Sequence, residues 1–175
     1  MSMFPIASVT LTSAGGVNFT SIPQTFTHLQ LRIFARTERF AAANDYFVVR
    51  PNSDSVGSTY FWHNLSGDGS SATSTGTTGQ LAAALGWLPG ASATANVFGN
   101  LIVDFLDYTN TNKYKTIKSI GGFDGNGSGN VTLSSGTYPS LTAITSILMG
   151  GNIANFIAGS RADLYGIQTS NATGA

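Results

Sequence analysis

Hydrophobic side chains alternate with polar ones along much of this chain, and this alternation is the feature that most restricts its fold. In the stretch THLQLRIFART (residues 27–37), Leu29, Leu31 and Ile33 fall on one face, while the polar residues between them fall on the other. A period of two is typical of a strand with one buried face, and the chain shows no convincing long helical pattern. The sequence therefore predicts a protein built from strands.

Further segments have strand-like composition, and clusters of Gly, Asn, Ser and Pro separate them. These predicted strands are Ser8–Thr12, Tyr46–Arg50, Ser58–Leu65, Asn96–Asp107, Lys113–Ile120, Asn130–Ser134, Ala143–Met149 and Ser160–Ile167. Many short strands at this spacing predict an all-β fold, an antiparallel β-sandwich of the jelly-roll type, with residues 1–175 forming a single domain. We expect residues 1–7 to form a short N-terminal arm.

Three segments carry more specific expectations. The segment Asn96–Asp107 is apolar on both faces over its middle, which predicts a central strand, and Gly99 within it predicts a bulge or a close backbone approach. The stretch TGQLAAALGWL (residues 78–88) is either a short helix or an extra strand, and Ser66–Gly79 is expected to be a long polar loop. The predicted core consists of Leu29, Leu31, Ile33, Leu101, Val103, Phe105, Ile117, Ile144 and Leu164.

Composition excludes several classes of function. The chain has no cysteine, so disulfides, thiolate metal sites and a cysteine nucleophile are ruled out. Only 9% of its residues are charged and its net charge is zero, so it lacks the basic face that nucleic-acid binding requires. The N-terminus does not resemble a signal peptide, and no apolar run reaches the length of about 18 residues that a membrane span needs. We therefore expect synthesis in a cytoplasm, with neither nucleic acid nor membrane as a partner.

The stretch GGFDGNGSGNVTLSSG (residues 121–136) resembles half of a calcium loop. Asp124, Asn126 and Ser128 alternate as oxygen-bearing residues, which makes them weak candidates for metal ligands. The position that needs a bidentate glutamate holds Ser135, however, and the flanking segments are predicted strands. The favoured interpretation is a hairpin turn, in which Gly and Asn adopt positive φ, so neither a metal nor another cofactor is predicted.

No arrangement of residues predicts catalysis. The two histidines, His28 and His63, lie on separate predicted strands, and Glu38 is the only glutamate. Asp104 and Asp107 are three residues apart on one strand, which places them on opposite faces and prevents them from acting as a paired acid and base. The chain is therefore not expected to be an enzyme, and no catalytic residue is assigned.

Aromatic residues near predicted loops suggest a binding module as one hypothesis. Tyr60 and Trp62 lie in the run YFWH, and Trp87 lies beside a glycine. Carbohydrate-binding sandwiches place exposed aromatic faces against sugar rings, with amide and carboxylate groups on the hydroxyls. The alternative is that alternate members of the run pack in the core.

Several motifs together resemble a group of small structural proteins encoded by tailed bacteriophages. They are VNFTSIPQTFTHLQLRIFART (Val17–Thr37), PGASATANVFGNLIVDFLDYTNTNKYKT (Pro89–Thr116), the hairpin Gly121–Gly136 and the closing LYGI (Leu164–Ile167). The corresponding patterns recur in the same order in that group. The resemblance implies a non-enzymatic β-sandwich that is part of the virion and is assembled in the host cytoplasm.

Within that group, the short arm and the absence of a shaft-like segment favour a capsid decoration or cement protein. We expect such a protein to bind other virion proteins, to be a homotrimer that matches three-fold lattice points, and to stabilise the shell through buried interface. The alternatives are a tail or fibre-tip component that binds host-surface glycan, and a lectin-like module unrelated to a virus. The predicted partner-binding residues are Phe4, Pro5, Arg32, Arg36, Tyr60, Trp62 and Trp87.

Overall fold

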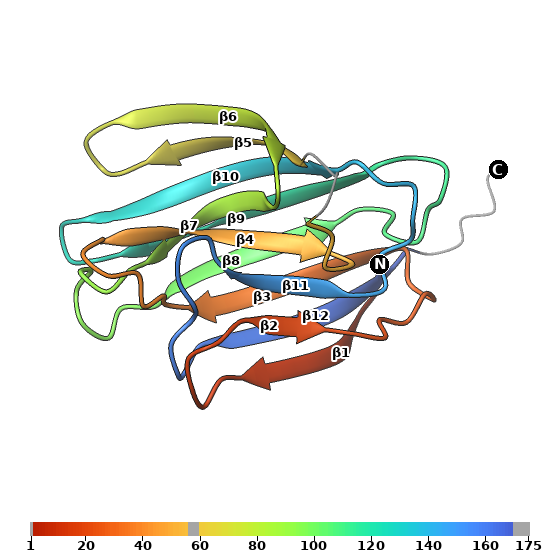
Figure 1. The fold of residues 1–175 in the computed structure, drawn as a ribbon, viewed down its shortest axis with the longest axis horizontal. Helices are drawn as coiled ribbons and strands as arrows, with labels where there is room; N and C mark the ends of the chain where they lie inside the picture. Colours follow the sequence, from red (N-terminus) through yellow and green to blue (C-terminus); the bar gives the residue numbers. More distant parts are fainter. Residues whose placement is uncertain (1, 56–59, 170–175) are drawn as a thin grey trace.

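The computed structural model describes residues 2–55 and 60–169, and its regular elements are all strands (Figure 1). The start of the predicted strand Ser58–Leu65 lies outside the described residues. The strands are β1 (Ser2–Thr10), β2 (Val17–Phe19), β3 (His28–Ala35), β4 (Asn44–Pro51), β5 (Tyr60–Gly67), β6 (Ala72–Gln80), β7 (Ala83–Pro89), β8 (Gly99–Phe105), β9 (Lys115–Asp124), β10 (Gly129–Tyr138), β11 (Ile147–Gly151) and β12 (Arg161–Gln168).

The strands form two antiparallel sheets that pack face to face, so the predicted all-β sandwich is confirmed. The large sheet has eight strands in the order β1-β12-β3-β8-β9-β10-β5-β6, and the small sheet has four in the order β2-β11-β4-β7. Strands far apart in the sequence, such as β1 and β12, are neighbours in space, as expected of a jelly-roll type of sandwich. The strand β8 lies centrally in the large sheet, as its sequence predicts.

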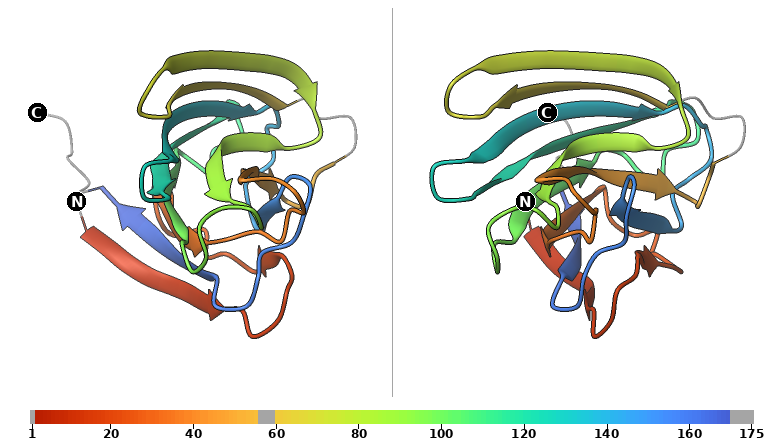
Figure 2. Two further views of the ribbon diagram at one scale, coloured as in Figure 1. Left: turned by 90° about the vertical axis from the view of Figure 1, so that its left-hand side faces the viewer. Right: turned by 60° about the vertical axis from the view of Figure 1, so that its left-hand side comes forward.

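The large sheet curves around the small one (Figure 2). β7 packs against β9 and β10, while β5 and β6 extend beyond the edge of the small sheet. None of the side chains of β6 is buried. The large sheet therefore has an inner face that contacts the small sheet and an outer face that no other element of the described residues covers.

The core lies between the inner faces of the two sheets. All of its predicted members are buried, none more than 3% exposed: Leu29, Leu31, Ile33, Leu101, Val103, Phe105, Ile117, Ile144 and Leu164. The small sheet contributes large side chains such as Phe47 and Leu85 from the opposite side. Gly99 marks a close approach, because a Cβ at this position would lie 2.9 Å from the ring of Pro89.

The predicted N-terminal arm is wrong for the described part of residues 1–7. Residues 2–10 form β1, which pairs with β12 along the edge of the large sheet. A bulge between Pro5 and Ala7 interrupts the pairing, since proline has no N–H to donate to the ladder. This segment is therefore part of the sandwich, and residues before Ala7 contribute to its edge.

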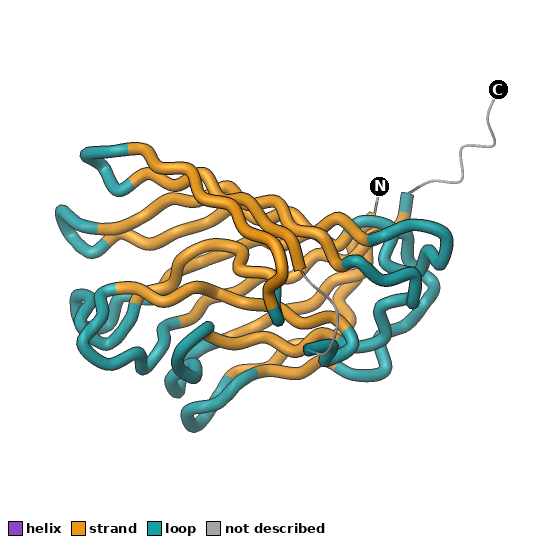
Figure 3. The backbone as a smooth tube through the Cα atoms, turned by 45° about the horizontal axis from the view of Figure 1, so that its top comes forward, coloured by secondary structure: helices purple, strands orange, loops and turns teal. Residues whose placement is uncertain are grey.

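The predicted loop Ser66–Gly79 is also largely wrong, because Ala72–Gln80 is the strand β6 and only a tight turn joins it to β5 (Figure 3). Asp68 holds that turn, since one of its carboxylate oxygens accepts hydrogen bonds from the backbone N–H groups of Ser70 and Ser71. Of the two interpretations of TGQLAAALGWL, the extra strand is the one observed, as β7. The sequence of β6 is mostly Thr, Ser and Gly, so apolar and polar residues do not alternate along it. The strand therefore could not be recognised from its hydrophobic pattern.

One buried carboxyl group belongs to β4 of the small sheet. The side chain of Asp45 is 0% exposed, and its Oδ2 accepts hydrogen bonds from the backbone N–H groups of Ile153 at 3.3 Å and Ala154 at 3.2 Å. Nη1 of Arg39 lies 3.7 Å from the other oxygen, which accepts no hydrogen bond within the described residues. Burial raises the pKa of Asp45 above its ordinary value, and the hydrogen bonds and Arg39 offset this only in part.

This raised pKa predicts a specific pH dependence of stability. Between the ordinary aspartate pKa and the raised one, the folded protein binds more protons at Asp45 than the unfolded chain does, so its free energy of unfolding should fall as pH rises. Asp45→Asn keeps the shape without the charge and should remove this contribution to the slope. Urea unfolding at a series of acidic pH values measures it, and identical slopes in both proteins would contradict the assignment.

Candidate functional site

The outer face of the large sheet carries a row of exposed aliphatic side chains. Ile102 on β8 lies opposite Ile120 on β9, Ile120 lies opposite Leu133 on β10, and Leu133 lies opposite Leu65 on β5. Their exposed fractions are 39% for Ile102, 54% for Ile120, 52% for Leu133 and 55% for Leu65. Because directly opposed residues have Cβ atoms about 5 Å apart on the same face, these four side chains form a continuous strip across four strands.

Two more apolar side chains widen this strip. Val131 is 61% exposed two residues before Leu133 on β10, and Phe34 is 52% exposed on β3. The ring of Phe34 stacks on that of Phe98 with the centroids 5.1 Å apart. We call this set the outer-face patch: Phe34, Leu65, Ile102, Ile120, Val131 and Leu133. Contiguous exposed apolar surface of this kind marks interaction sites in soluble proteins.

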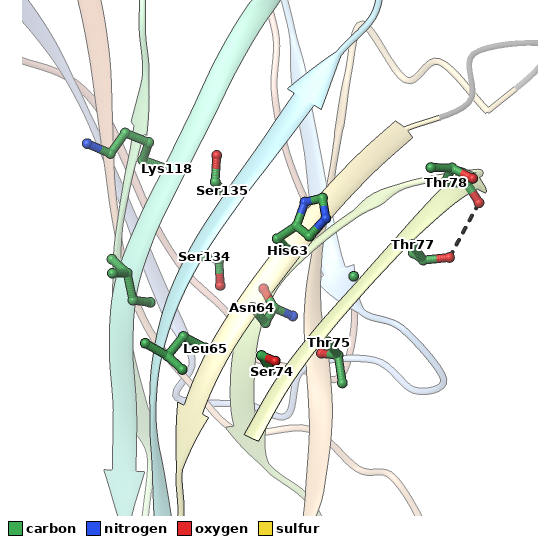
Figure 4. Close-up of a pocket in the computed structure, with 12 residues that line it drawn as sticks. His63, Asn64, Leu65, Ser74, Thr75, Thr77, Thr78, Lys118, Ser134 and Ser135 are labelled. Atoms are coloured by element: carbon green, nitrogen blue, oxygen red, sulfur yellow. Dashed lines mark hydrogen bonds between the residues drawn. The ribbon is translucent and has the colours of Figure 1, made fainter. Parts of the chain in front are cut away.

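A shallow depression of about 940 Å³ adjoins the patch where β9, β10, β5 and β6 lie side by side (Figure 4). Leu65 and Leu133 contribute apolar surface to it, and Lys118, Ser135 and His63 contribute polar groups. These three polar residues lie opposite one another on successive strands, and Figure 4 shows Ser135 between the other two. The depression thus combines an apolar part with hydrogen-bonding groups and a cation.

A glycine on β6 shapes one wall of this depression. Gly76 lies opposite His63, and a Cβ at this position would come within 2.3 Å of the imidazole ring. The missing side chain therefore lets the ring of His63 lie flat against β6, which is the usual role of a glycine paired with an aromatic residue across strands.

Beyond the patch, the same row of the sheet becomes charged. Arg32 on β3 lies opposite Ile102, Asp163 on β12 lies opposite Arg32, and Ser8 on β1 lies opposite Asp163. The hydroxyl of Ser8 donates a hydrogen bond to Asp163, and the guanidinium of Arg32 lies 5.4 Å from the ring centroid of Tyr165. Arg32 is therefore exposed on the outer face at the margin of the patch, and its role in binding a partner stays a prediction.

Phe4 and Pro5 also remain exposed, at the edge of the large sheet. Phe4 is 43% exposed, and its ring stacks on that of Phe26 with the centroids 5.8 Å apart. Pro5 lies opposite Tyr165 on β12. Three strands, β12, β3 and β8, separate these residues from the nearest end of the depression on β9, so they do not belong to the same site.

The prediction that Arg36 binds a partner is wrong, because this side chain is only 7% exposed. Its Nη1 donates to the carbonyl oxygens of Thr94 at 2.7 Å and Val97 at 3.1 Å, and its Nη2 donates to those of Ala91 at 3.2 Å and Ala93 at 2.9 Å. Arg36 therefore holds the loop between β7 and β8 to the end of β3. Its position at the end of an alternating strand gave no sign of these contacts.

The prediction for Tyr60 is also wrong, since its side chain is 0% exposed and lies in the core. The ring stacks on that of Tyr138 with the centroids 5.7 Å apart, and its hydroxyl donates to the carbonyl oxygen of Asp54 at 3.1 Å. Burial raises the pKa of Tyr60. Tyr60 is therefore not available to a partner.

The two predicted tryptophans meet around a residue that the sequence did not single out. The ring centroid of Tyr46 on β4 lies 3.6 Å from that of Trp87 on β7 and 5.6 Å from that of Trp62 on β5. A bulge in β7 makes this possible. Tyr46 lies opposite Trp87 and Val48 lies opposite Ala84, so a step of two residues along β4 matches a step of three residues along β7. A strict period of two would have placed Trp87 on the other face.

Gly86 forms this bulge, and we expect Gly86→Ala to lower the free energy of unfolding by about 2 kcal/mol. Gly86 has a φ of +118°, and a Cβ there would lie 2.5 Å from a methyl carbon of Leu101. Urea unfolding measures the loss, and near-ultraviolet circular dichroism reports the stacking of Tyr46 on Trp87. Gly150→Ala is the matched control, since in the described part of the chain no atom outside its two chain neighbours lies within 4 Å of its added Cβ. Equal stability of the two variants would contradict this role for the bulge.

The stretch that resembles a calcium loop is the hairpin between β9 and β10, as predicted. Asp124 lies opposite Gly129, and Asn126 and Gly127 adopt positive φ values of 63° and 93°. The carboxylate of Asp124 accepts a hydrogen bond of 2.8 Å from the backbone N–H of Asn126, so it stabilises the turn itself. Ser128 accepts a backbone hydrogen bond from Gly125 within the same turn. In the described ranges, no group of three or more His, Cys, Asp or Glu side chains is placed to hold a metal ion.

Several other titratable side chains form contacts within the protein. Nδ1 of His28 accepts a hydrogen bond of 2.9 Å from the backbone N–H of Asp107, and Lys113 forms an ion pair with the carboxylate of Asp107. Asp104 accepts a hydrogen bond of 3.0 Å from the amide of Gln30 on the outer face. His63 lies at the depression, four strands of the large sheet away from β3 and its His28.

Comparison with protein-family models, with curated proteins and with solved structures finds no match to this chain. Among the residues that the structure describes, no helix is long and apolar enough to cross a membrane. The outer-face patch with its adjoining depression is therefore the candidate site on structural grounds alone.

Proposed function

We propose that this chain is a non-enzymatic structural protein of a bacteriophage virion, a capsid decoration or cement protein that docks through its outer-face patch. The observation that carries the proposal is the exposed row formed by Ile102, Ile120, Leu133 and Leu65 on successive strands. Exposed aliphatic side chains are common singly, but a row aligned across four strands is surface that a partner would cover. The motifs shared with tailed-phage structural proteins supply the class of partner.

The size of the outer face suits a stable protein–protein contact. Eight strands about 4.8 Å apart give a width of roughly 38 Å, and between eight and nine residues per strand on average, at ~3.3 Å each, give a length of roughly 28 Å. The product is on the order of 1,100 Å², whereas a standard interface takes about 800 Å² from each partner. The face is also rigid, because backbone hydrogen bonds hold each strand on both sides except at the sheet edges.

Docking of this kind would stabilise a shell without chemistry. A protein that binds only the assembled lattice shifts the assembly equilibrium towards the particle by mass action. The apolar patch would provide the hydrophobic contribution, and the charged margin with Arg32 and Asp163 would fix orientation through complementary charges. A homotrimer at three-fold lattice points remains part of the proposal, since it would present three such faces to neighbouring capsomers.

A tail or fibre-tip position with glycan binding is the second candidate. The observation that favours it is the aromatic group of Tyr46, Trp62 and Trp87, because aromatic rings beside polar groups suit sugar ligands.

Copy number in purified particles separates the two candidates. Quantitative mass spectrometry of the particles, with the major capsid protein as the internal reference, should give a ratio comparable to that of the capsid protein. A few copies per particle would instead move the chain to the tail. Complete absence from the particle would reject the virion assignment.

A further inference from the structure

A second, more enclosed cleft lies on the opposite side of the molecule from the outer-face patch. It has a volume of about 340 Å³ and opens on the face of the small sheet that points away from the core. Along β4, Tyr46, Val48 and Arg50 point to this face, while the alternate residues Phe47 and Val49 lie in the core. A cleft of this size falls within the range of small-molecule sites.

Small side chains make the floor of the cleft. Ala82 and Ala84 are 7% and 6% exposed beside Val48, which is 2% exposed, and the three form a separate small apolar cluster. Larger residues at the two alanines would fill this space. The cleft is therefore a built hollow with an apolar floor rather than a gap between loops.

Aromatic rings make one wall. Trp62 reaches this wall from β5 of the large sheet, because β5 curls past the edge of β7 (Figure 2). Its ring lies at 50° to that of Tyr46, and both rings remain partly exposed. Trp87 stacks on Tyr46 and lies outside the cleft lining, so it holds the ring of Tyr46 in place. An aromatic wall that is fixed before a ligand arrives reduces the entropy cost of binding.

Polar groups complete the lining of the cleft. Arg50, Gln80 and Asn152 line the cleft together, and among the described residues no carboxylate does. The Nε of Arg50 donates a hydrogen bond of 3.2 Å to the carbonyl oxygen of Leu81, which fixes the plane of the guanidinium. Side-chain amides both donate and accept hydrogen bonds, so they can satisfy hydroxyl groups in either direction.

We propose that this cleft binds one pyranose ring of a saccharide. The apolar face of the sugar would lie against Trp62 and Tyr46, and its hydroxyls would bond to Gln80 and Asn152. Arg50 would donate a hydrogen bond to a hydroxyl oxygen of a neutral sugar, or pair with the carboxylate of a uronic acid. This proposal specifies the ligand and the residues of the second candidate function. It does not depend on docking through the outer-face patch, because the cleft shares no described lining residue with the hollows on the outer face.

Tryptophan fluorescence tests the proposal directly, because the chain has two tryptophans and both belong to this aromatic group. Trp87→Phe keeps an aromatic ring against Tyr46 and leaves Trp62 as the sole tryptophan. We expect titration of this variant with methyl glucoside, methyl galactoside, N-acetylglucosamine or glucuronate to give a saturable change with at least one probe. Saturation-transfer NMR on the unmodified protein should identify the same probe.

Two further variants locate the binding. Asn152→Ala removes an exposed amide at the cleft and should weaken the best probe at least tenfold, and Arg50→Met should weaken glucuronate more than a neutral glycoside. Lys118→Met, at the depression on the outer face, should leave the affinity unchanged. The proposal is overturned if no probe binds by either method, or if Asn152→Ala and Arg50→Met both bind as tightly as the parent protein. Either result leaves the copy-number test of virion assembly unaffected.

Discussion

Arg36→Met should lower the free energy of unfolding by about 3 kcal/mol or more, one of the two largest effects we expect of a substitution in this protein. The guanidinium donates to the carbonyl oxygens of Ala91, Ala93, Thr94 and Val97, so its loss removes the donors of four backbone groups at once. Methionine fills similar space without a donor, and the loop between β7 and β8 would have to open to reach water. Urea unfolding monitored by circular dichroism measures the loss.

Arg32→Met on the same sheet is the matched control. Arg32 is exposed, with its guanidinium 5.4 Å from the ring centroid of Tyr165 and its Nε 3.3 Å from the side-chain oxygen of Gln30. Exposed contacts of this kind contribute little, so the control should change stability by less than about 1 kcal/mol. Similar losses in both variants would show that the contacts of Arg36 with the loop do not stabilise the fold.

The double variant Ile120→Lys, Leu133→Glu should weaken binding to the particle by roughly 100-fold or more while leaving the fold intact. Burying two large aliphatic side chains contributes about 3–6 kcal/mol, and every 1.4 kcal/mol is a factor of about ten in affinity. The two positions are directly opposed on β9 and β10, so the new charges are opposite and should preserve the strand pairing. Cosedimentation with particles that lack the protein measures the affinity.

Ile153→Lys serves as the control for this pair. Ile153 is 66% exposed, like the two patch residues, but lies outside the large sheet, between β11 and β12. We expect it to bind particles with unchanged affinity. Undiminished binding by the double variant, with its melting temperature preserved, would exclude the outer-face patch as the docking surface.

Much of the fold could be predicted because the alternation of side chains is a local property. Residues such as Leu29, Leu31 and Ile33 show which face of β3 is buried without any knowledge of its neighbours. β6 escaped detection for the same reason, since its Ser, Thr and Gly residues are exposed on both faces and give no hydrophobic signal. Its existence depends on backbone pairing with β5, which the sequence does not display.

The candidate site could be predicted only in part, because it depends on register. The sequence of β8 is apolar on both faces, which predicted a central strand, and β8 is central in the large sheet. Its outer face is nevertheless open, since Ile102 is 39% exposed there. An apolar residue on the second face of β8 was the feature of the sequence that could have indicated a contact surface there. Which of them line up across β8, β9, β10 and β5 follows from strand order and pairing, and neither is encoded locally.

The aromatic group and Arg36 also depend on features that a local sequence pattern does not reveal, namely a bulge and a long-range contact. Trp87 meets Tyr46 because Gly86 introduces a bulge, and a single inserted residue reverses the side to which every later side chain points. Arg36 falls on the polar face of the alternating pattern, yet the loop between β7 and β8 packs over its guanidinium. Long-range contacts of this kind decide whether a charged side chain is available to a partner.

Side-chain footprinting of the bound protein tests the central claim most directly. Carbene labelling with mass spectrometry would compare the free protein with the protein on the particle, residue by residue. Docking through the outer-face patch predicts that Ile120, Leu133 and Leu65 lose most of their labelling on the particle, while Ile153 keeps its own. Unchanged labelling of the three patch residues on particles that carry the protein would contradict this account of how it binds.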